Sequence, residues 1–229
     1  MKFVISKEEL NGLIGHIQNV VTQKATIPIL SNILIEASGS ELVITATDLT
    51  VGVRCRTEAK VFEEGATTLP AKKFAQLIRE ITAPHIEFSS TSDDVSKITA
   101  GSSHFNLHGI NKGEFPVLPD MSGAAQFKIK GEKLQDALFR TAFAVSREDH
   151  RPILTGVLMS IENGTVAFIG TDGKRLAKIE QNIDIDESAS GQYVIPLKAV
   201  EEILKISGDD DAIVYIMEDK IAIDTNKST

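Results

Sequence analysis

The chain is 229 residues long, with 42% hydrophobic and 24% charged residues and a formal net charge of −8. This composition is typical of a folded globular protein and excludes a disordered tail, a collagen-like chain and a disulfide-rich scaffold. The acidic balance argues against bulk electrostatic coating of nucleic acid, because such binders carry a basic surplus. Aromatic residues make up only 5% of the chain, so stacking platforms for unpaired bases are not expected.

The N-terminal residues and the single cysteine bear on the compartment. Cys55 has no second cysteine with which to form an internal disulfide. The opening segment, MKFVISKEEL, contains no apolar run of the length that a signal peptide or a membrane span requires. We therefore expect a cytoplasmic protein.

The two halves of the sequence resemble each other at a fixed offset, first of 124 and then of 126 residues. A repeat of this length has the size of a whole domain, whereas solenoid units run from about 20 to 50 residues. The order of the matches is kept throughout, which predicts two copies of one fold. The matched pairs are Phe3 with Phe127, Leu10 with Leu134, residues 28–30 with 152–154, residues 47–48 with 171–172, Gly65 with Gly191, Pro70 with Pro196, and Lys72 with Lys198.

Each copy is predicted to begin with a strand and a helix. Apolar residues recur at helical spacing in residues 7–21, and residues 131–145 repeat this pattern. Alternating β-branched runs separated by short polar turns follow, which predicts antiparallel strands. A second helix is expected where a proline opens residues 70–81 and 196–206, and more strands follow it. The predicted class is α+β, with two helices packed on antiparallel sheets in the order βαβββαβββ.

Residues 111–125, NKGEFPVLPDMSGAA, lack periodicity and predict an extended linker between the copies. We therefore expect one domain over residues 1–120 and a second over residues 121–229. The offset places the last strand of a complete second copy near residue 236, beyond Thr229. The second domain is thus expected to be incomplete, and the chain to be part of a longer polypeptide.

Five blocks spread over the chain carry a family resemblance. They are ATDLTVGVR (46–54), PAKKF (70–74), GEFPVLPD (113–120), SREDHRPILTGVLM (146–159) and GTDGKRLAKI (170–179). With these motifs the sequence resembles the bacterial DNA polymerase III β sliding clamps. The resemblance implies three such domains per subunit, of which this chain holds the first two, and two subunits that close head to tail into a ring.

The resemblance also implies the function. Such a ring encircles duplex DNA without reading its sequence and tethers the replicative polymerase, the clamp loader and other replication and repair proteins. It implies a non-catalytic processivity subunit of the polymerase holoenzyme, with no cofactor and no metal. One alternative is a protein-only scaffold whose sheets dock partners without encircling DNA, and another is a metal-dependent phosphotransferase.

The resemblance assigns DNA contact to basic residues on the helices and the loop before residue 152. The predicted helices hold eight basic and seven acidic side chains, so they are less acidic than the rest of the chain. Glu201 and Glu202 are expected to weaken the nearby lysines, so the first domain should dominate DNA contact. The candidates are Lys24, Lys72, Lys73, Arg79, Arg147, Arg151, Lys198 and Lys205.

A hydrophobic groove that accepts short apolar peptides is also implied for the second domain. Its expected residues are Leu154, Thr171, Gly173, Lys174, Arg175 and Leu176. Glycine permits close backbone approach, the leucines supply an apolar floor, and arginine can bond peptide carbonyls. The first copy, Thr47 to Val51, shares the turn position but not the Gly-Lys-Arg-Leu set. The plainer alternative is a tight turn with two core leucines, and Lys174 stands where many relatives carry histidine.

Three other features invite chemistry that we do not assign. Asp48 and Asp172 could hold a metal, but an aspartate after a strand commonly caps a turn. His104 and His108 share a strand face without a third ligand. Cys55 has no motif around it and is expected in the core.

Overall fold

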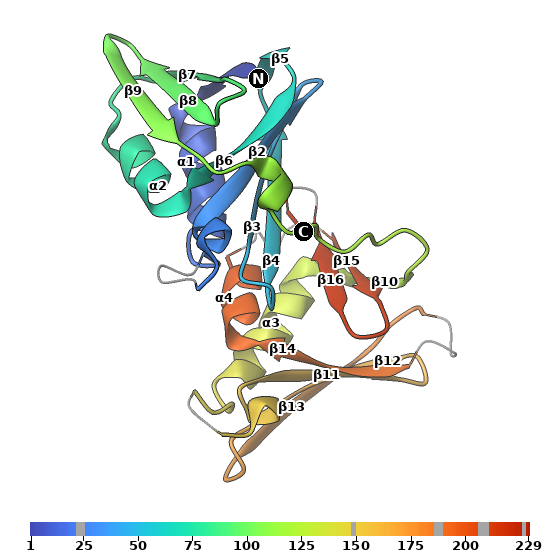
Figure 1. Ribbon diagram of the computed structural model, residues 1–229. Coiled ribbons are helices and arrows are strands. Elements are labelled where there is room, and N and C mark those ends of the chain that lie inside the picture. Colours follow the sequence, from blue (N-terminus) through green and yellow to red (C-terminus); the bar gives the residue numbers. More distant parts are fainter. Residues whose placement is uncertain (22–25, 148–149, 186–189, 206–210, 226–227) are drawn as a thin grey trace. The chain divides into compact units, whose positions relative to one another are not determined.

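The computed structural model describes the chain except residues 22–25, 148–149, 186–189, 206–210 and 226–227 (Figure 1). It divides into two compact units, residues 1–118 and residues 119–227, with Ser228 counted to the first and Thr229 to the second. Within the described ranges each unit carries two α-helices, and the strand pairs are antiparallel. The predicted α+β class is confirmed.

The first unit holds two sheets, in the strand orders β5-β1-β7-β8-β9 and β4-β3-β2-β6. Helix α1 packs on β3 and β4 and lies next to α2. Phe3 stacks on Phe88 with 4.8 Å between ring centroids, and Phe74 of α2 meets Phe88 edge-on at 6.4 Å. The elements are β1 (Lys2–Ser6), α1 (Lys7–Ile17), β2 (Asn32–Ser38), β3 (Glu41–Thr47), β4 (Gly52–Glu58), β5 (Lys60–Glu63), β6 (Gly65–Pro70), α2 (Ala71–Glu80), β7 (His85–Ser90), β8 (Val95–Ala100) and β9 (Ser103–His108).

The second unit repeats this plan with sheets β13-β12-β11-β14 and β10-β15-β16. Phe127 and Leu134 are buried like their partners Phe3 and Leu10 in the repeat, so the matched positions are core positions. The described residues after α4 form two strands, against three after α2. The elements are β10 (Ala125–Lys130), α3 (Gly131–Ala142), β11 (Gly156–Glu162), β12 (Thr165–Thr171), β13 (Leu176–Asn182), β14 (Gly191–Pro196), α4 (Leu197–Ile203), β15 (Asp211–Ile216) and β16 (Ile221–Asp224).

Helix positions follow the predicted periodicity, but the helices end earlier than predicted. Ser6 caps α1 by accepting a hydrogen bond from the Glu9 backbone N–H at 3.1 Å. Prolines 70 and 196 occupy the caps of α2 and α4, as their place before each helix predicts. Helix α1 ends at Ile17 rather than at residue 21, and α3 ends at Ala142.

The predicted count of three strands between the helices is wrong. Among the described residues, five strands lie there in the first unit and four in the second. The strand β6 was missed because two of its buried side chains, Thr67 and Thr68, are polar and break the apolar alternation. Strands β4 and β5 appear continuous in sequence, but the chain leaves one sheet at Ala59 and joins the other.

The predicted linker is ordered at its start. Lys112–Glu114 forms a 3₁₀ turn capped by Asn111, whose side chain accepts a hydrogen bond from the Gly113 N–H at 2.8 Å. Phe115 is buried and packs on Ile29 and Leu30. The first part of this segment therefore belongs to the first unit, and the two units divide after Leu118.

The packing of α3 on β12 generates a stability prediction. A Cβ at Gly170 would lie 2.0 Å from the Thr141 carbonyl oxygen, which belongs to the helix backbone. Gly170→Ala should therefore destabilise the second unit by about 1–3 kcal/mol. Gly12→Ala is the matched control, because nothing lies within 4 Å of its Cβ position in α1. It should stabilise the first unit by about 0.5–1 kcal/mol. Urea unfolding of both variants measures this, and equal stability of Gly170→Ala and wild type would contradict it.

Candidate functional site

Five of the six predicted peptide residues, Thr171, Gly173, Lys174, Arg175 and Leu176, lie at the turn between β12 and β13, and Leu154 lies in the 3₁₀ turn before β11. The Thr171 hydroxyl donates to the Arg175 carbonyl at 2.7 Å and accepts from the Gly173 N–H at 3.0 Å. Asp172 Oδ1 accepts from the backbone N–H groups of Lys174 and Arg175, both at 3.0 Å. Gly173 has φ +87°, a left-handed conformation that glycine adopts without steric cost. The side chains of Thr171 and Asp172 thus stabilise the turn by hydrogen bonds to its backbone.

The first unit contains the same turn with the same bonds. Thr47 bonds the Val51 carbonyl at 3.0 Å, and Asp48 accepts from Thr50 and Val51 at 3.0 and 2.8 Å. Leu49 occupies the place of Gly173 with φ +74°. The turn-capping interpretation of both aspartates is therefore confirmed. What distinguishes the copies is the side chains that the turn presents.

In the second unit the turn presents an arginine and a leucine to solvent. The side chain of Leu176 is 66% exposed, and that of Ile153 is 63% exposed. Leu154 is half-buried, and its carbonyl accepts a hydrogen bond from the Ser146 N–H at 2.9 Å. Arg151 also lies here, since its Nη2 is 3.7 Å from the Cβ position at Gly173. A residue predicted to contact DNA is thus placed beside the predicted peptide turn.

Arg175 is held by two neighbours. Its Nε donates to Asp172 Oδ2 at 3.0 Å, and its guanidinium lies 5.6 Å from the centre of the Phe143 ring. Phe143, at the end of α3, was missed as a site residue. The sequence held a signal for it, because Phe139 and Phe143 recur one turn apart on the polar face of an amphipathic helix.

The corresponding surface of the first unit is covered. Ile29 and Leu30, the repeat partners of Ile153 and Leu154, are buried against Phe115. Gly52 stands in the place of Leu176, and a Cβ there would lie 2.7 Å from Leu118 Cδ2. The chain's own residues 115–118 therefore pack where the second unit has exposed apolar side chains.

The basic candidates of the first unit gather on α2. Lys72, Lys73 and Arg79 are exposed on its polar face, opposite the buried residues Phe74 and Ile78. Arg79 also joins the two helices, because its Nη2 donates to Gln18 Oε1 at 3.4 Å and its carbonyl accepts from Lys7 Nζ at 3.2 Å. The remaining candidate, Lys24, lies outside the described residues.

The basic candidates of the second unit are partly neutralised. Lys205 Nζ forms an ion pair with Glu202 Oε1 at 2.7 Å, and Glu202 is buried. Lys198 is half-buried, while Arg147 and Glu201 are exposed. The contact between Glu202 and Lys205 is therefore present, and the expected weakening of Lys205 toward DNA stays a prediction.

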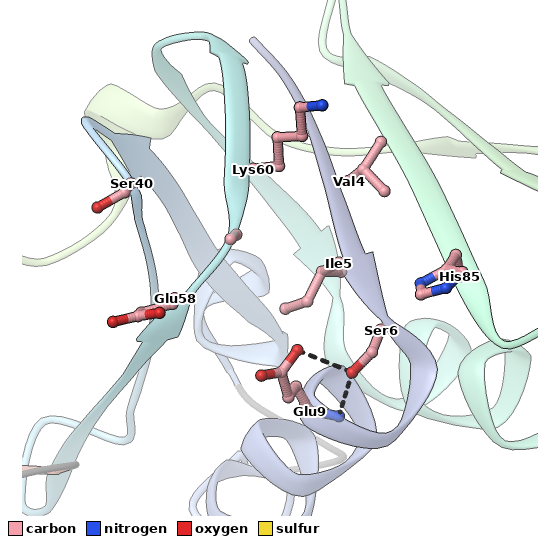
Figure 2. A pocket seen from close by; sticks show the side chains of 9 residues that line it. Val4, Ile5, Ser6, Glu9, Ser40, Glu58, Lys60 and His85 are labelled. Carbon is pink, nitrogen blue, oxygen red and sulfur yellow. Dashed lines mark hydrogen bonds between the residues drawn. The ribbon is translucent and has the colours of Figure 1, made fainter.

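A hollow of about 450 Å³ lies in the first unit, and none of the residues that line it is a predicted site residue (Figure 2). Val4 and Ile5 supply an apolar part, while Glu9, Glu58, Lys60 and His85 line the remainder. Figure 2 shows Ser6 hydrogen-bonded to Glu9 at its base. Because two carboxylates face it, this hollow does not favour a phosphate group.

The other sequence features have structural explanations. Cys55 is buried, as predicted. His104 Nδ1 lies 3.2 Å from Thr99 Oγ1. Within the described ranges, no three His, Cys, Asp or Glu side chains gather as metal ligands would. None of the helices over those ranges is long and apolar enough to cross a membrane.

Comparison with known proteins defines a class, that of tandem DNA polymerase clamp domains. Residues 1–119 match the model of the DNA polymerase III beta subunit N-terminal domain, and residues 128–229 match that of its central domain. The chain belongs to the DNA polymerase III beta subunit family. The resemblance seen in the sequence motifs is confirmed.

Relatives and solved structures agree with this assignment. The beta sliding clamp of Chlamydia muridarum is 52% identical over 225 residues, which cover 98% of this chain and 62% of that protein. The Chlamydia pneumoniae clamp is 50% identical over 229 residues, 63% of its length. The Bacillus subtilis sliding clamp structure superposes with a TM-score of 0.93 at 27% identity, covering 100% of this chain and 63% of that one. The chain thus spans less than two thirds of the relatives it matches.

The turn network generates a prediction for Asp172. The backbone N–H bonds of Lys174 and Arg175, with the Arg175 charge as a smaller cause, hold the pKa of this carboxyl below its ordinary value of 3.8. Because the folded pKa is depressed, the turn gains stability above the unfolded pKa and loses it as the pH falls through the folded value. A carboxyl ¹³C NMR titration measures the pKa. Arg175→Ala should raise it only in part, and a wild-type value at or above 3.8 would contradict the prediction.

Proposed function

We propose that this chain comprises the first two domains of a DNA sliding clamp, with boundaries near residues 1–120 and 121–229. The observation that carries the proposal is the consecutive match of both units to the N-terminal and central domains of the polymerase III beta subunit. The complete protein would encircle duplex DNA as a ring and tether the replicative polymerase, the clamp loader and other partners. It would act in the cytoplasm as a non-catalytic subunit.

The charge distribution supports encirclement rather than adhesive binding. The chain is acidic overall, yet α2 carries three basic side chains against the single carboxylate of Glu80. A threaded ring stays on DNA by topology, so it needs only a locally favourable lining. We assign DNA contact chiefly to α2, with lesser parts for Lys24, Arg147, Arg151, Lys198 and Lys205.

The edge of the first unit's larger sheet supports ring closure. Strand β9 is the terminal strand of that sheet and pairs on one side with β8. An edge strand presents backbone donors and acceptors that a strand of another subunit can pair with. We assign β9 to a head-to-tail contact with a second subunit of the complete protein.

The exposed surface around the β12–β13 turn supports peptide capture. It combines apolar side chains, an arginine held in place and a backbone turn fixed by four hydrogen bonds. We assign partner binding to Leu154, Thr171, Gly173, Lys174, Arg175 and Leu176. The Pseudomonas aeruginosa sliding clamp has been solved bound to griselimycin. We propose that the complete protein binds this ligand too, and that the β12–β13 turn described above is its binding site.

Retention on closed DNA tests the proposed function. The full-length protein, loaded by its clamp loader, should remain on nicked circular duplex and be lost after a restriction enzyme linearises the DNA. A threaded ring slides off a free end, whereas an adhesive binder does not. Equal retention on both forms would indicate adhesive binding and refute the ring proposal, and retention on neither form would favour the protein-only scaffold.

The assignment to α2 predicts a change in salt dependence. Replacing Lys72, Lys73 and Arg79 with Glu in the full-length protein should weaken duplex affinity. Each lost phosphate contact should reduce the slope of log K against log salt by about 0.9. Replacing Lys198 and Lys205 is the comparison and should have a smaller effect, because Glu202 already pairs with Lys205. An unchanged slope for the α2 variant would mean that these residues face away from DNA.

The assignment to the turn predicts weaker ligand binding. Arg175→Ala should weaken griselimycin binding by the full-length protein about tenfold, as expected for a lost charge-assisted hydrogen bond. Leu176→Ala should have an effect of similar size through lost apolar burial. Calorimetry measures both, and circular dichroism should show unchanged folds because both side chains are exposed. Wild-type affinity in both variants would remove the assignment.

The 229-residue chain should not close into a ring by itself, because the third domain is expected to supply the partner for β9. Sedimentation at micromolar concentration should show no tight dimer. A stable closed dimer of this chain would refute the assignment of β9.

A further inference from the structure

Arg175 and its neighbour Phe143 have no counterparts in the first copy, although both copies form the same turn. The first copy forms the same hydrogen bonds with Val51 in the place of Arg175 and Asn19 in the place of Phe143. Phe143 is therefore not needed to build the turn. It is also 62% exposed, so core packing does not account for it.

We propose that Phe143 is a positioning residue for the peptide site. With Asp172, it holds the Arg175 guanidinium in a fixed orientation above the turn before a ligand arrives. This inference rests on the proposed peptide-binding function.

Two contacts of different kinds define that orientation. Asp172 Oδ2 accepts from Nε at 3.0 Å, which occupies one of the five N–H donors of the guanidinium. The Phe143 ring lies 5.6 Å from the guanidinium carbon, within the range of a cation–π contact. The ion pair alone lets the guanidinium plane rotate about the line from Nε to Asp172 Oδ2. The Phe143 ring on one side of the group restricts this rotation. Together they fix both the position and the plane of the group.

This arrangement matters because the Arg175 side chain is 56% exposed. An exposed arginine loses rotamer freedom when it binds a peptide carbonyl, and that loss opposes binding. A guanidinium already held by two contacts loses less. Its planar donors are then presented to a peptide beside Leu176.

The first test needs no ligand. In NMR spectra of the 229-residue chain, the ring current of Phe143 should shift the Arg175 Hδ and Nε–H resonances upfield. Phe143→Ala and Phe143→Leu should remove the shift, and Phe143→Tyr should keep it. Arg175 resonances that do not move in Phe143→Ala would overturn the proposal, whatever the site binds.

The second test is a double-mutant cycle with griselimycin and the full-length protein. Phe143→Ala should weaken binding about three- to fivefold, the size of an exposed cation–π contact. Phe143→Leu should match it, and Phe143→Tyr should restore binding to within about twofold of wild type. When Arg175 is already replaced by Ala, Phe143→Ala should cause no further loss of griselimycin affinity.

The outcomes separate this inference from the site assignment. Phe139→Ala is the control, because Phe139 lies one turn earlier on α3 and is 70% exposed. It should leave binding unchanged. If Arg175→Ala weakens binding but Phe143→Ala does not, or if the two losses add, Phe143 has no positioning role and the peptide site stands. If Arg175→Ala has no effect, the site assignment itself fails, and the ligand-free spectra still decide whether Phe143 orients Arg175.

Discussion

The candidate site depends on a hydrogen-bonded turn that a threonine and an aspartate close against the backbone. At the ends of β3 and β12, the hydroxyl bonds both sides of the turn and the carboxylate accepts two N–H groups. These bonds fix where the next two side chains point. Because the network uses only Thr, Asp and backbone atoms, the following residues are free to differ. One copy could therefore keep Val51 inside while the other presents Arg175.

Much of the fold could be predicted from the sequence because the chain is a duplication. The matched pairs Phe3 with Phe127 and Leu10 with Leu134 are core residues, and a core repeats only when the fold repeats. Strand β6 escaped prediction because two of its three buried residues, Thr67 and Thr68, are polar. The start of the linker escaped it because its order comes from a long-range contact between Phe115 and Ile29. A local sequence pattern does not indicate a contact between residues that are far apart in the chain. The spacing of Phe139 and Phe143 marks an exposed apolar pair in the sequence, but the contact between Phe143 and Arg175 is visible only in the structure.

Net charge is a poor guide to DNA binding in a protein of this architecture. The acidic total argues against bulk adhesion to phosphate, but it leaves open a ring whose attachment is topological. Local placement carries the information instead. The α2 helix has three cations on one face, whereas the lysine after α4 is paired with a buried glutamate.

The packing of residues 115–118 on the first unit has a consequence for synthesis. Ile29, Leu30 and the Gly52 position remain uncovered until Phe115 and Leu118 reach them, some 60 to 90 residues later in the chain. Domains generally fold as units while the chain emerges from the ribosome. The first unit therefore cannot finish folding at the end of its last strand, β9, and must wait for the segment that leads into the second. The first unit therefore completes its packing only when the ribosome has already made the segment that begins the second unit.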